Sequence, residues 1–294
     1  MKVPLPKVIQ KVLQECLDNF NEQKTGVRAG RDVEFLHEIR VAGRRLINAL
    51  WAFSSFLTDQ DVEIWQKLIK RFNRYVGEAR DIDVQVEFLK DFKKKYKADE
   101  EFVDVVISGL QKKRSKLQAK IMSSLNELED KKVLASVGHE IRGVGQHPLV
   151  CTGSEAYRFA ELKISARLKE LIAFKKYVDR PECVHELHMM RNAVRNLRYT
   201  MEAFAGLYPK NYQEFLTALQ KLQGFLGKIH DMDVWAQELS KSAHRIKAHD
   251  HKAAGHLIGH CKKERIKTYK AFVLFWERCQ KDHFWKKLGL AIAG

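Results

Sequence analysis

The chain has 294 residues, of which 45% are hydrophobic and 31% charged, a composition that excludes an intrinsically disordered protein. No run of about 18 apolar residues occurs, so no transmembrane helix and no membrane association are predicted. The net charge of +16 and the pI near 9.6 favour an acidic partner: a nucleic acid, an anionic lipid or an inorganic phosphate chain.

The cysteines and the first residues predict a cytoplasmic protein. The five cysteines lie at positions 16, 151, 183, 261 and 279, without a CxxC pair. Scattered cysteines in odd number indicate reduced thiols and no zinc site or disulfide framework. The first ten residues, MKVPLPKVIQ, lack the apolar core of a signal peptide.

Apolar residues recur at helical spacing along the whole chain, strand-like alternation is nearly absent, and only five prolines occur. This pattern predicts an all-α fold with about eight or more helices. In chain order, the spacing occurs in segments 8–17, 68–76, 117–125, 162–171 and 216–226.

The segment GVGQHPLVCTGS (143–154) interrupts the helical pattern near the middle of the chain. Glycine and proline in such a stretch indicate a boundary between helical segments. We therefore predict two halves, residues 1–147 and 148–294.

The two halves contain repeated motifs. The segment HEIRVAGRRLINALWAF (37–53) matches HMMRNAVRNLRYTMEAF (188–204) at an offset of 151 residues. The segment YVGEARDIDV (75–84) matches FLGKIHDMDV (225–234) at an offset of 150. Matches in the same order at one spacing predict a tandem duplication.

A third, weaker match sets QKKRSKLQAK (111–120) against CKKERIKTYK (261–270), again at an offset of 150. The repeating unit is therefore about 150 residues long, with about four helices. We expect two four-helix bundles packed together.

The first repeated helix has two opposite faces. At about 100° per residue, His37, Arg40 and Arg44 share one face, with Arg45 to the side. The opposite face carries Leu46, Leu50 and Phe53. The basic face contains no acid, and like charges three and four residues apart repel each other unless an anion or carboxylates face them.

The second copy has the same two faces. His188, Arg191, Arg195 and Arg198 lie opposite Leu197, Met201 and Phe204. Arginine can bind phosphate oxygens with two parallel hydrogen bonds, and a protonated histidine can donate two. A basic face that occurs twice favours an anion-binding site over an ordinary solvated surface.

The HxxRxxxR helix followed by an LGxxRDxD-like segment resembles the CHAD family, named for its histidine-bearing α-helical domain, over nearly the whole chain. The resemblance implies two four-helix bundles with pseudo-two-fold symmetry around a basic central channel. It also implies non-catalytic binding of inorganic polyphosphate in that channel, without a cofactor, and suggests gathering on polyphosphate granules. The second copy departs from the pattern at Asn192 and Asn196, and it has His230 where the first copy has Arg80.

The candidate polyphosphate-binding residues come from the repeated helices and from other basic positions expected to line the channel. They are His37, Arg40, Arg44, Arg45, Lys70, Arg74, Arg80, Lys112, Lys116, Lys120, His188, Arg191, Arg195, Arg198, Lys221, Lys228, Lys263, Lys267 and Lys270. Four aspartates would repel a phosphate chain, so we expect them to orient the basic side chains rather than bind a metal. They are Asp81, Asp83, Asp231 and Asp233.

Two alternative functions remain open at this stage. A nucleic-acid binder, in particular an RNA binder, fits the charge, but aromatic platforms for bases are not evident. A metal-dependent phosphohydrolase is suggested only by the pair His230–Asp231 and the spacing of His256 and His260, without a completing ligand set. No nucleotide-binding or nucleophile motif occurs, and we expect neither a metal nor catalysis.

Overall fold

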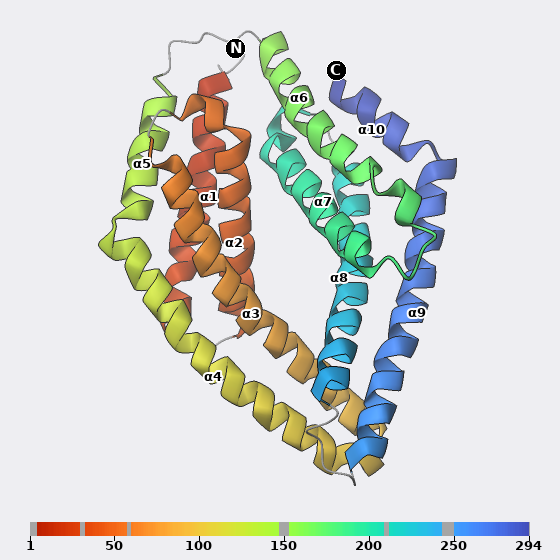
Figure 1. Ribbon diagram of the computed structural model, residues 1–294. Coiled ribbons are helices and arrows are strands. Elements are labelled where there is room, and N and C mark those ends of the chain that lie inside the picture. Colours follow the sequence, from red (N-terminus) through yellow and green to blue (C-terminus); the bar gives the residue numbers. More distant parts are fainter. Residues whose placement is uncertain are drawn as a thin grey trace. The chain divides into compact units, whose positions relative to one another are not determined.

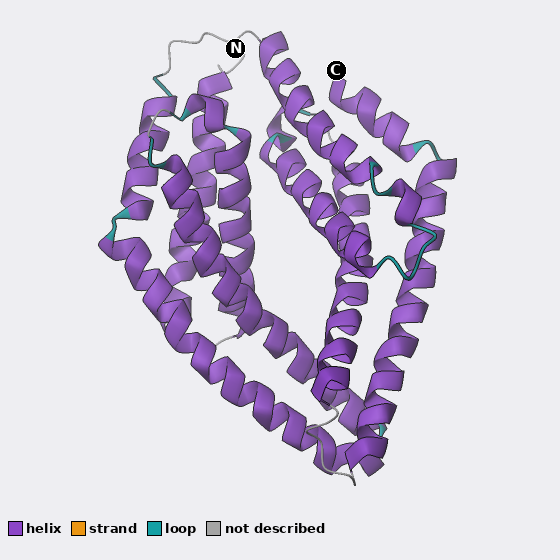
Figure 2. Ribbon diagram, in the orientation of Figure 1, coloured by secondary structure: helices purple, strands orange, loops and turns teal. Residues whose placement is uncertain are grey.

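The computed structural model describes residues 5–29, 33–57, 60–146, 153–208, 212–242 and 250–293. Within these ranges it contains ten α-helices and four short 3₁₀ helices and no strand, which confirms the predicted all-α fold (Figure 2). None of the helices in the described ranges is both long enough and apolar enough to cross a membrane.

The chain divides into two compact units. The first unit contains Met1–Lys95 and Val103–Ala156, and the second contains Tyr96–Phe102 and Tyr157–Gly294. The predicted boundary between residues 147 and 148 lies outside the described residues and stays a prediction. The predicted channel between the halves also stays a prediction.

The first unit is a bundle in which α1 packs against α2 and α5, and α3 packs against α2 and α5 (Figure 1). The rings of Phe20 and Phe72 meet edge to face in its core, with centroids 5.7 Å apart. The helices are α1 (Leu5–Ala29), α2 (Val33–Ala52), α3 (Val62–Lys95), α4 (Glu100–Asp130) and α5 (Val133–Val144).

In the second unit α8 packs against α7 and α9, and the short α10 packs against α9. The rings of Phe215 and Phe284 link α8 to α10 at 5.1 Å. The helices are α6 (Gly153–Ile172), α7 (Val184–Ala203), α8 (Tyr212–Ser242), α9 (His251–Lys281) and α10 (Phe284–Ala293).

The two units share one order of elements. Each has four longer helices followed by a short fifth one that the sequence pattern did not separate. The helices α2 and α7 begin 151 residues apart, and α3 and α8 begin 150 residues apart. These spacings are those of the repeated motifs, although the origin of the repeat by duplication stays a prediction.

The apolar faces predicted for α2 and α7 form part of the core. Leu46 and Leu50 in α2, Phe53 directly after it, and their counterparts in and after α7 are at most 1% exposed. Burying each such side chain contributes about 1.5–3 kcal/mol to stability. Both helices pass into a 3₁₀ turn, η1 (Ser54–Phe56) and η4 (Ala205–Leu207). With one face fixed in the core, the basic face of each helix is turned away from it.

Candidate anion-binding site

Arg40 is held on the basic face of α2 by the neighbouring helix α3. Its Nη1 donates a hydrogen bond of 2.6 Å to Oδ1 of Asp81, and Nη2 lies 3.5 Å from Oδ2. The side chain of Arg40 is 13% exposed, whereas that of Asp81 is 55% exposed. Asp81 therefore orients a largely buried guanidinium while it remains in contact with solvent itself.

Gly77 makes room for Arg40 one turn before Asp81. A Cβ atom at Gly77 would lie 3.3 Å from Nε of Arg40 and 3.4 Å from its Cζ, which is closer than most real Cβ contacts. The guanidinium thus lies directly against the backbone of α3. Its Nε is buried and has no hydrogen-bond acceptor among the described residues.

The second unit repeats this arrangement with Arg191 and Gly227. A Cβ atom at Gly227 would lie 3.7 Å from Nε of Arg191. That Nε is also buried and lacks an acceptor within the described part of the chain. The repeated arginine and the repeated glycine of the sequence therefore lie next to each other in both units.

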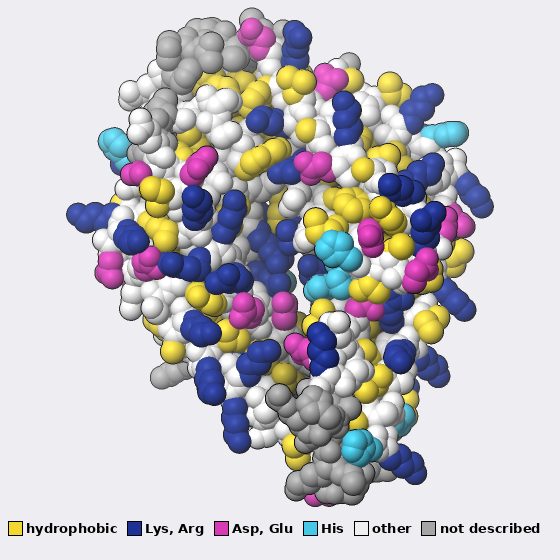
Figure 3. Space-filling view, viewed as in Figure 1, with side chains coloured by type: hydrophobic (Ala, Val, Ile, Leu, Met, Phe, Trp, Pro, Cys, Tyr) yellow, Lys and Arg dark blue, Asp and Glu magenta, His cyan; other side chains and the backbone are white. Residues whose placement is uncertain are grey.

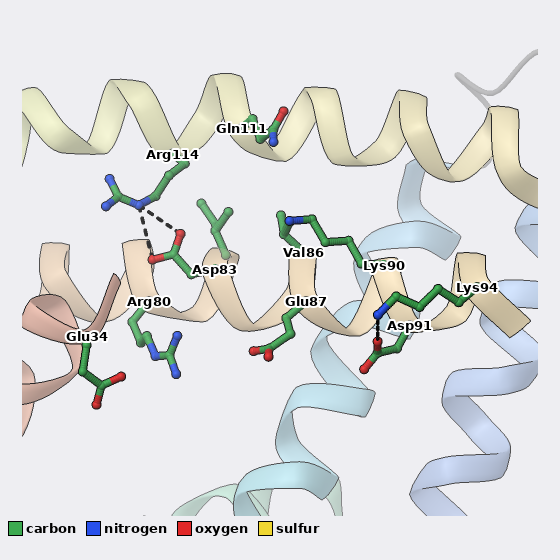
Figure 4. A pocket seen from close by; sticks show the side chains of 11 residues that line it. Glu34, Arg80, Asp83, Val86, Glu87, Lys90, Asp91, Lys94, Gln111 and Arg114 are labelled. Atoms are coloured by element: carbon green, nitrogen blue, oxygen red, sulfur yellow. Dashed lines mark hydrogen bonds and ion pairs between the residues drawn. The ribbon is translucent and has the colours of Figure 1, made fainter. Parts of the chain in front are cut away.

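Asp83 accepts hydrogen bonds from α4 (Figure 4). Nε of Arg114 lies 3.2 Å from Oδ1 of Asp83 and 3.5 Å from Oδ2, and its Nη1 donates to Gln118. Burial raises the pKa of Asp83 above its ordinary value, and the charges of Arg114 and Arg80 oppose that increase. Asp83 thus joins α3 to α4 and contacts none of the basic residues predicted on α2.

Asp233 has the equivalent position in α8 and joins three helices. Its Oδ1 accepts a short hydrogen bond from Nε of Arg265 in α9, and its Oδ2 lies 3.3 Å from Nε2 of His188 in α7. The guanidinium of Arg265 also donates to the backbone oxygen of Pro181, at 2.7 Å. In the first unit no such contact joins His37 to Asp83 among the described residues.

His188 also contacts His230 on α8. The two imidazole rings are nearly perpendicular, at 82°, with centroids 4.2 Å apart. His230 occupies the position that Arg80 has in the first unit. A pair of histidines in one unit therefore corresponds to a histidine and an arginine in the other.

The sequence prediction missed Arg114 and Arg265. The two side chains make equivalent contacts with Asp83 and Asp233 and lie 151 residues apart. The third sequence match was made at an offset of 150, which sets Arg114 against Glu264 and hides the repeated arginine. Shifting that match by one residue would have found it.

The remaining predicted arginines of α2 and α7 differ in exposure. Arg44 and Arg195 are half-buried and Arg45 is exposed. Arg198 lies with its guanidinium 4.7 Å above the ring of Tyr199, and its Nη1 is 3.2 Å from Oε1 of Glu202. Arg198 is therefore already engaged by an acid on its own helix.

Two of the other predicted basic residues have partners within their own unit. Lys228 donates a hydrogen bond of 2.7 Å to Glu264, which holds the pKa of that carboxyl below its ordinary value. Arg74 lies 3.9 Å from Glu78. The predicted lysines are exposed, and Figure 3 shows basic side chains interspersed with acidic ones over the visible face. They are Lys70, Lys112, Lys116, Lys120, Lys221, Lys228, Lys263, Lys267 and Lys270.

A cavity of about 640 Å³ lies beside Asp83 in the first unit. It is lined by side chains of both signs, and Figure 4 shows Lys94 beside Asp91 at one end and Arg114 beside Asp83 at the other. A lining of mixed charge does not select a polyanion. The arginines of α2 do not line this cavity.

One group of side chains within the described ranges has the spacing of metal ligands. Glu34, His37 and Glu38 place one ligand atom each within 4.8 Å of one another. They lie on a single turn of α2 and could hold a divalent cation at most loosely, because three ligands on one exposed turn leave most of the coordination shell to water. The pair His256 and His260 is not part of any such group, and His256 instead lies 2.5 Å from Asp99.

In the described residues, each of the two helical units has a helix with a basic face that contacts an aspartate of a neighbouring helix, Asp81 for Arg40 of α2 and Asp233 for His188 of α7. The chain belongs to the CHAD family, because the CHAD domain model matches residues 11–240.

Two solved structures share the fold. The CHAD domain of the plant Ricinus communis matches with a TM-score of 0.73 and 20% identity, covering 93% of this chain and 91% of that one. PptA from Streptomyces chartreusis matches with a TM-score of 0.68 and 15% identity, covering 94% and 100%. A search of curated protein sequences finds no significant match.

Proposed function

We propose that the protein binds inorganic polyphosphate, without catalysis, through the basic faces of α2 and α7. The observation that carries this proposal is the arginine that lies against a glycine backbone in both units, Arg40 on Gly77 and Arg191 on Gly227. A polyphosphate chain carries about one negative charge per internal phosphate and offers no bases, so fixed cations suit it better than base-specific hydrogen bonds. Membership of the CHAD family supports the same function.

The aspartates explain how cations can be fixed close together without an anion present. A guanidinium has five N–H donors, and Asp81 uses one on each Nη of Arg40. The second N–H of each Nη is left for phosphate oxygens. Asp81 thus lowers the repulsion along α2 and sets the direction of the remaining donors.

Charge reversal tests the proposal. Changing Arg40, Arg44, Arg191 and Arg195 to Glu should weaken binding of long-chain polyphosphate by at least about 100-fold, because four attractive contacts become repulsive. A matched control reverses four exposed lysines elsewhere, namely Lys11, Lys169, Lys252 and Lys281. Circular dichroism should show that both variants are folded. If the arginine variant is not folded, a milder variant with Gln at the same four arginine positions replaces it.

Equal losses in the arginine and lysine variants would mean that only the net charge matters. Unchanged affinity in a folded arginine variant would place the site elsewhere. In the native protein, affinity should fall steeply with salt as counterions are released, and a flat salt dependence would contradict ionic binding.

Two further measurements address the alternative functions. RNA of matched total charge should compete poorly with polyphosphate, since Tyr199, whose ring lies against Arg198, is only 4% exposed and offers no free face for a base to stack on. Incubation with Mg²⁺ or Mn²⁺ should release no phosphate. Equal competition by RNA, or phosphate release, would replace the proposal by the corresponding alternative.

We extend the proposal to the cell: a binder of this kind would lie in the cytoplasm and gather on polyphosphate granules. A fluorescent fusion of the native protein should co-localise with granules. The fusion carrying Glu at the four arginine positions should remain diffuse.

A further inference from the structure

The second unit contains a pair of contacting histidines within its basic region. His188 and His230 lie at 4.2 Å from centroid to centroid, and Nε2 of His188 is 3.3 Å from Oδ2 of Asp233. Histidine side chains generally change charge between about pH 5 and 8.

Charged groups of both signs lie around the pair. Arg191 lies one turn along α7 from His188, and Arg265 reaches Asp233 from α9. Asp231 and Asp233 are the acids of this part of α8. These two arginines and two aspartates are equal in number, and Arg195, one turn further along α7, adds a positive charge whatever the protonation of the histidines. Each protonated histidine adds one positive charge.

The first unit has one more arginine at the equivalent positions. Its equivalent residues include three arginines, Arg40, Arg80 and Arg114, against the two acids Asp81 and Asp83. Arg80 stands where the second unit has His230, and arginine keeps its charge up to pH 12 or beyond.

We propose that His188 and His230 form a proton-linked phosphate-binding pair, through which the second unit binds polyphosphate more tightly as the pH falls. This inference rests on the proposed function of the same site. It adds His230 to the binding residues and assigns the pH dependence of binding mainly to the second unit.

The coupling follows from the distance between the two rings. Two imidazolium ions 4.2 Å apart repel each other, so the second proton is unfavourable while no anion is present. A phosphate chain beside them offsets that repulsion and accepts hydrogen bonds from both rings. Binding of the anion and uptake of protons therefore favour each other, as linkage requires.

Reciprocal exchanges of the two equivalent residues test the inference. Affinity for polyphosphate is measured from pH 6 to 8 at constant ionic strength in the full chain. The native protein should bind about tenfold more tightly at pH 6, since each linked proton changes the affinity by up to tenfold per pH unit. His230→Arg should reduce this ratio to about threefold by raising the affinity at pH 8, and Arg80→His should increase it.

Two controls separate a proton-linked role from other effects. His251→Arg changes the charge in the same way at an exposed position of α9 and should leave the pH ratio unchanged. His230→Gln should also reduce the ratio to about threefold, in this case by lowering the affinity at pH 6, and it replaces His230→Arg if that variant does not fold. Calorimetry in two buffers of different ionisation enthalpy should show proton uptake on binding that decreases in both His230 variants.

The outcomes distinguish this inference from the proposed function. If polyphosphate binds but the His230 variants keep the native pH ratio and proton uptake, the histidine pair is not involved and the inference is wrong. If polyphosphate binds at no pH, the proposed function fails and the inference fails with it.

Discussion

The two units use one arrangement of helices with different networks of charged side chains. In the first unit the acids serve separate partners, Arg40 for Asp81 and Arg114 for Asp83. In the second unit Asp233 contacts both Arg265 and His188. The backbone thus repeats more closely than the side-chain contacts do. We therefore expect a single replacement, such as His230 for Arg80, to give the two units different responses to pH and to substitution.

The largest expected difference between the units concerns the buried aspartates. Asp233→Asn should lower the free energy of unfolding by about 3 kcal/mol, because it leaves Arg265 without its charged partner in a site where both side chains are at most 15% exposed. Asp83→Asn should cost only about 1 kcal/mol, since burial already disfavours the ionised form of Asp83. Urea denaturation of the two variants measures both values.

The pH dependence of these variants gives a second criterion. Because the pKa of Asp83 is raised by folding, the folded chain binds its proton more readily than the unfolded chain does. The stability contributed by Asp83 is therefore present at low pH and decreases as the pH rises above about 3.8 through the raised value. The free energy of unfolding of Asp83→Asn should not show this decrease with pH. If Asp83→Asn and Asp233→Asn lower the free energy of unfolding equally at both pH 4 and pH 7, the predicted difference between the two aspartates is wrong.

The glycines under the arginines should respond differently to a methyl group. Gly227→Ala should stabilise the protein by about 1 kcal/mol through helix propensity, with polyphosphate affinity unchanged, because its Cβ would make an ordinary contact at 3.7 Å. Gly77→Ala should gain less and should weaken binding about twofold, because Arg40 must move by a few tenths of an ångström. Thermal unfolding and binding measured on both variants check this, and identical behaviour would mean that Arg40 adapts freely.

A smaller effect on polyphosphate affinity is expected at Lys228 in the second unit, which forms an ion pair with Glu264. Glu264→Gln should free Lys228 and raise affinity for polyphosphate about twofold at low salt. Glu277→Gln, at an exposed position of the same helix, is the matched control for the loss of one acid. A titration at 50 mM salt compares them, and equal gains would show that Lys228 makes no specific contribution.

The smallest effect concerns the thiols, which report on packing in each unit. Burial raises the pKa of Cys261 and Cys279 in α9 to about 11, so their thiolate fraction near pH 8 is about 100-fold below that of an ordinary cysteine. Cys16 in α1 and Cys183 are half-exposed. Mass spectrometry after iodoacetamide treatment should find the half-exposed thiols modified first. Early modification of Cys261 would indicate that α9 opens locally.

Much of the fold could be predicted from periodicity alone. The opposite faces of α2 and α7 follow from residue spacing, and Leu46 and Leu197 are indeed fully buried. The same spacing misleads at Leu162, which is 64% exposed, because a helical repeat shows which residues share a face but not whether another element covers it.

The site could be predicted only in part, because spacing does not determine the partner of a side chain. Asp81 does contact Arg40, while the role of the aspartates in orienting a binding site stays a prediction. The sequence analysis missed Arg114 and Arg265, which lie on α4 and α9 and contact the aspartates Asp83 and Asp233. It also treated Lys228 as available to a ligand, although an acid from α9 takes its hydrogen bond. Such contacts between helices depend on side-chain direction and on register shifts of a single residue.

The placement of Arg40 against Gly77 also affects the entropy of binding. A free arginine side chain loses up to about 2 kcal/mol of rotamer entropy when it is immobilised. Arg40 packs against Gly77 and is hydrogen-bonded to Asp81, so it has lost most of that rotamer freedom once the chain is folded. A phosphate chain that binds as proposed would therefore contact a side chain that is already ordered. The enthalpy of its contacts is then offset by little further ordering of the protein.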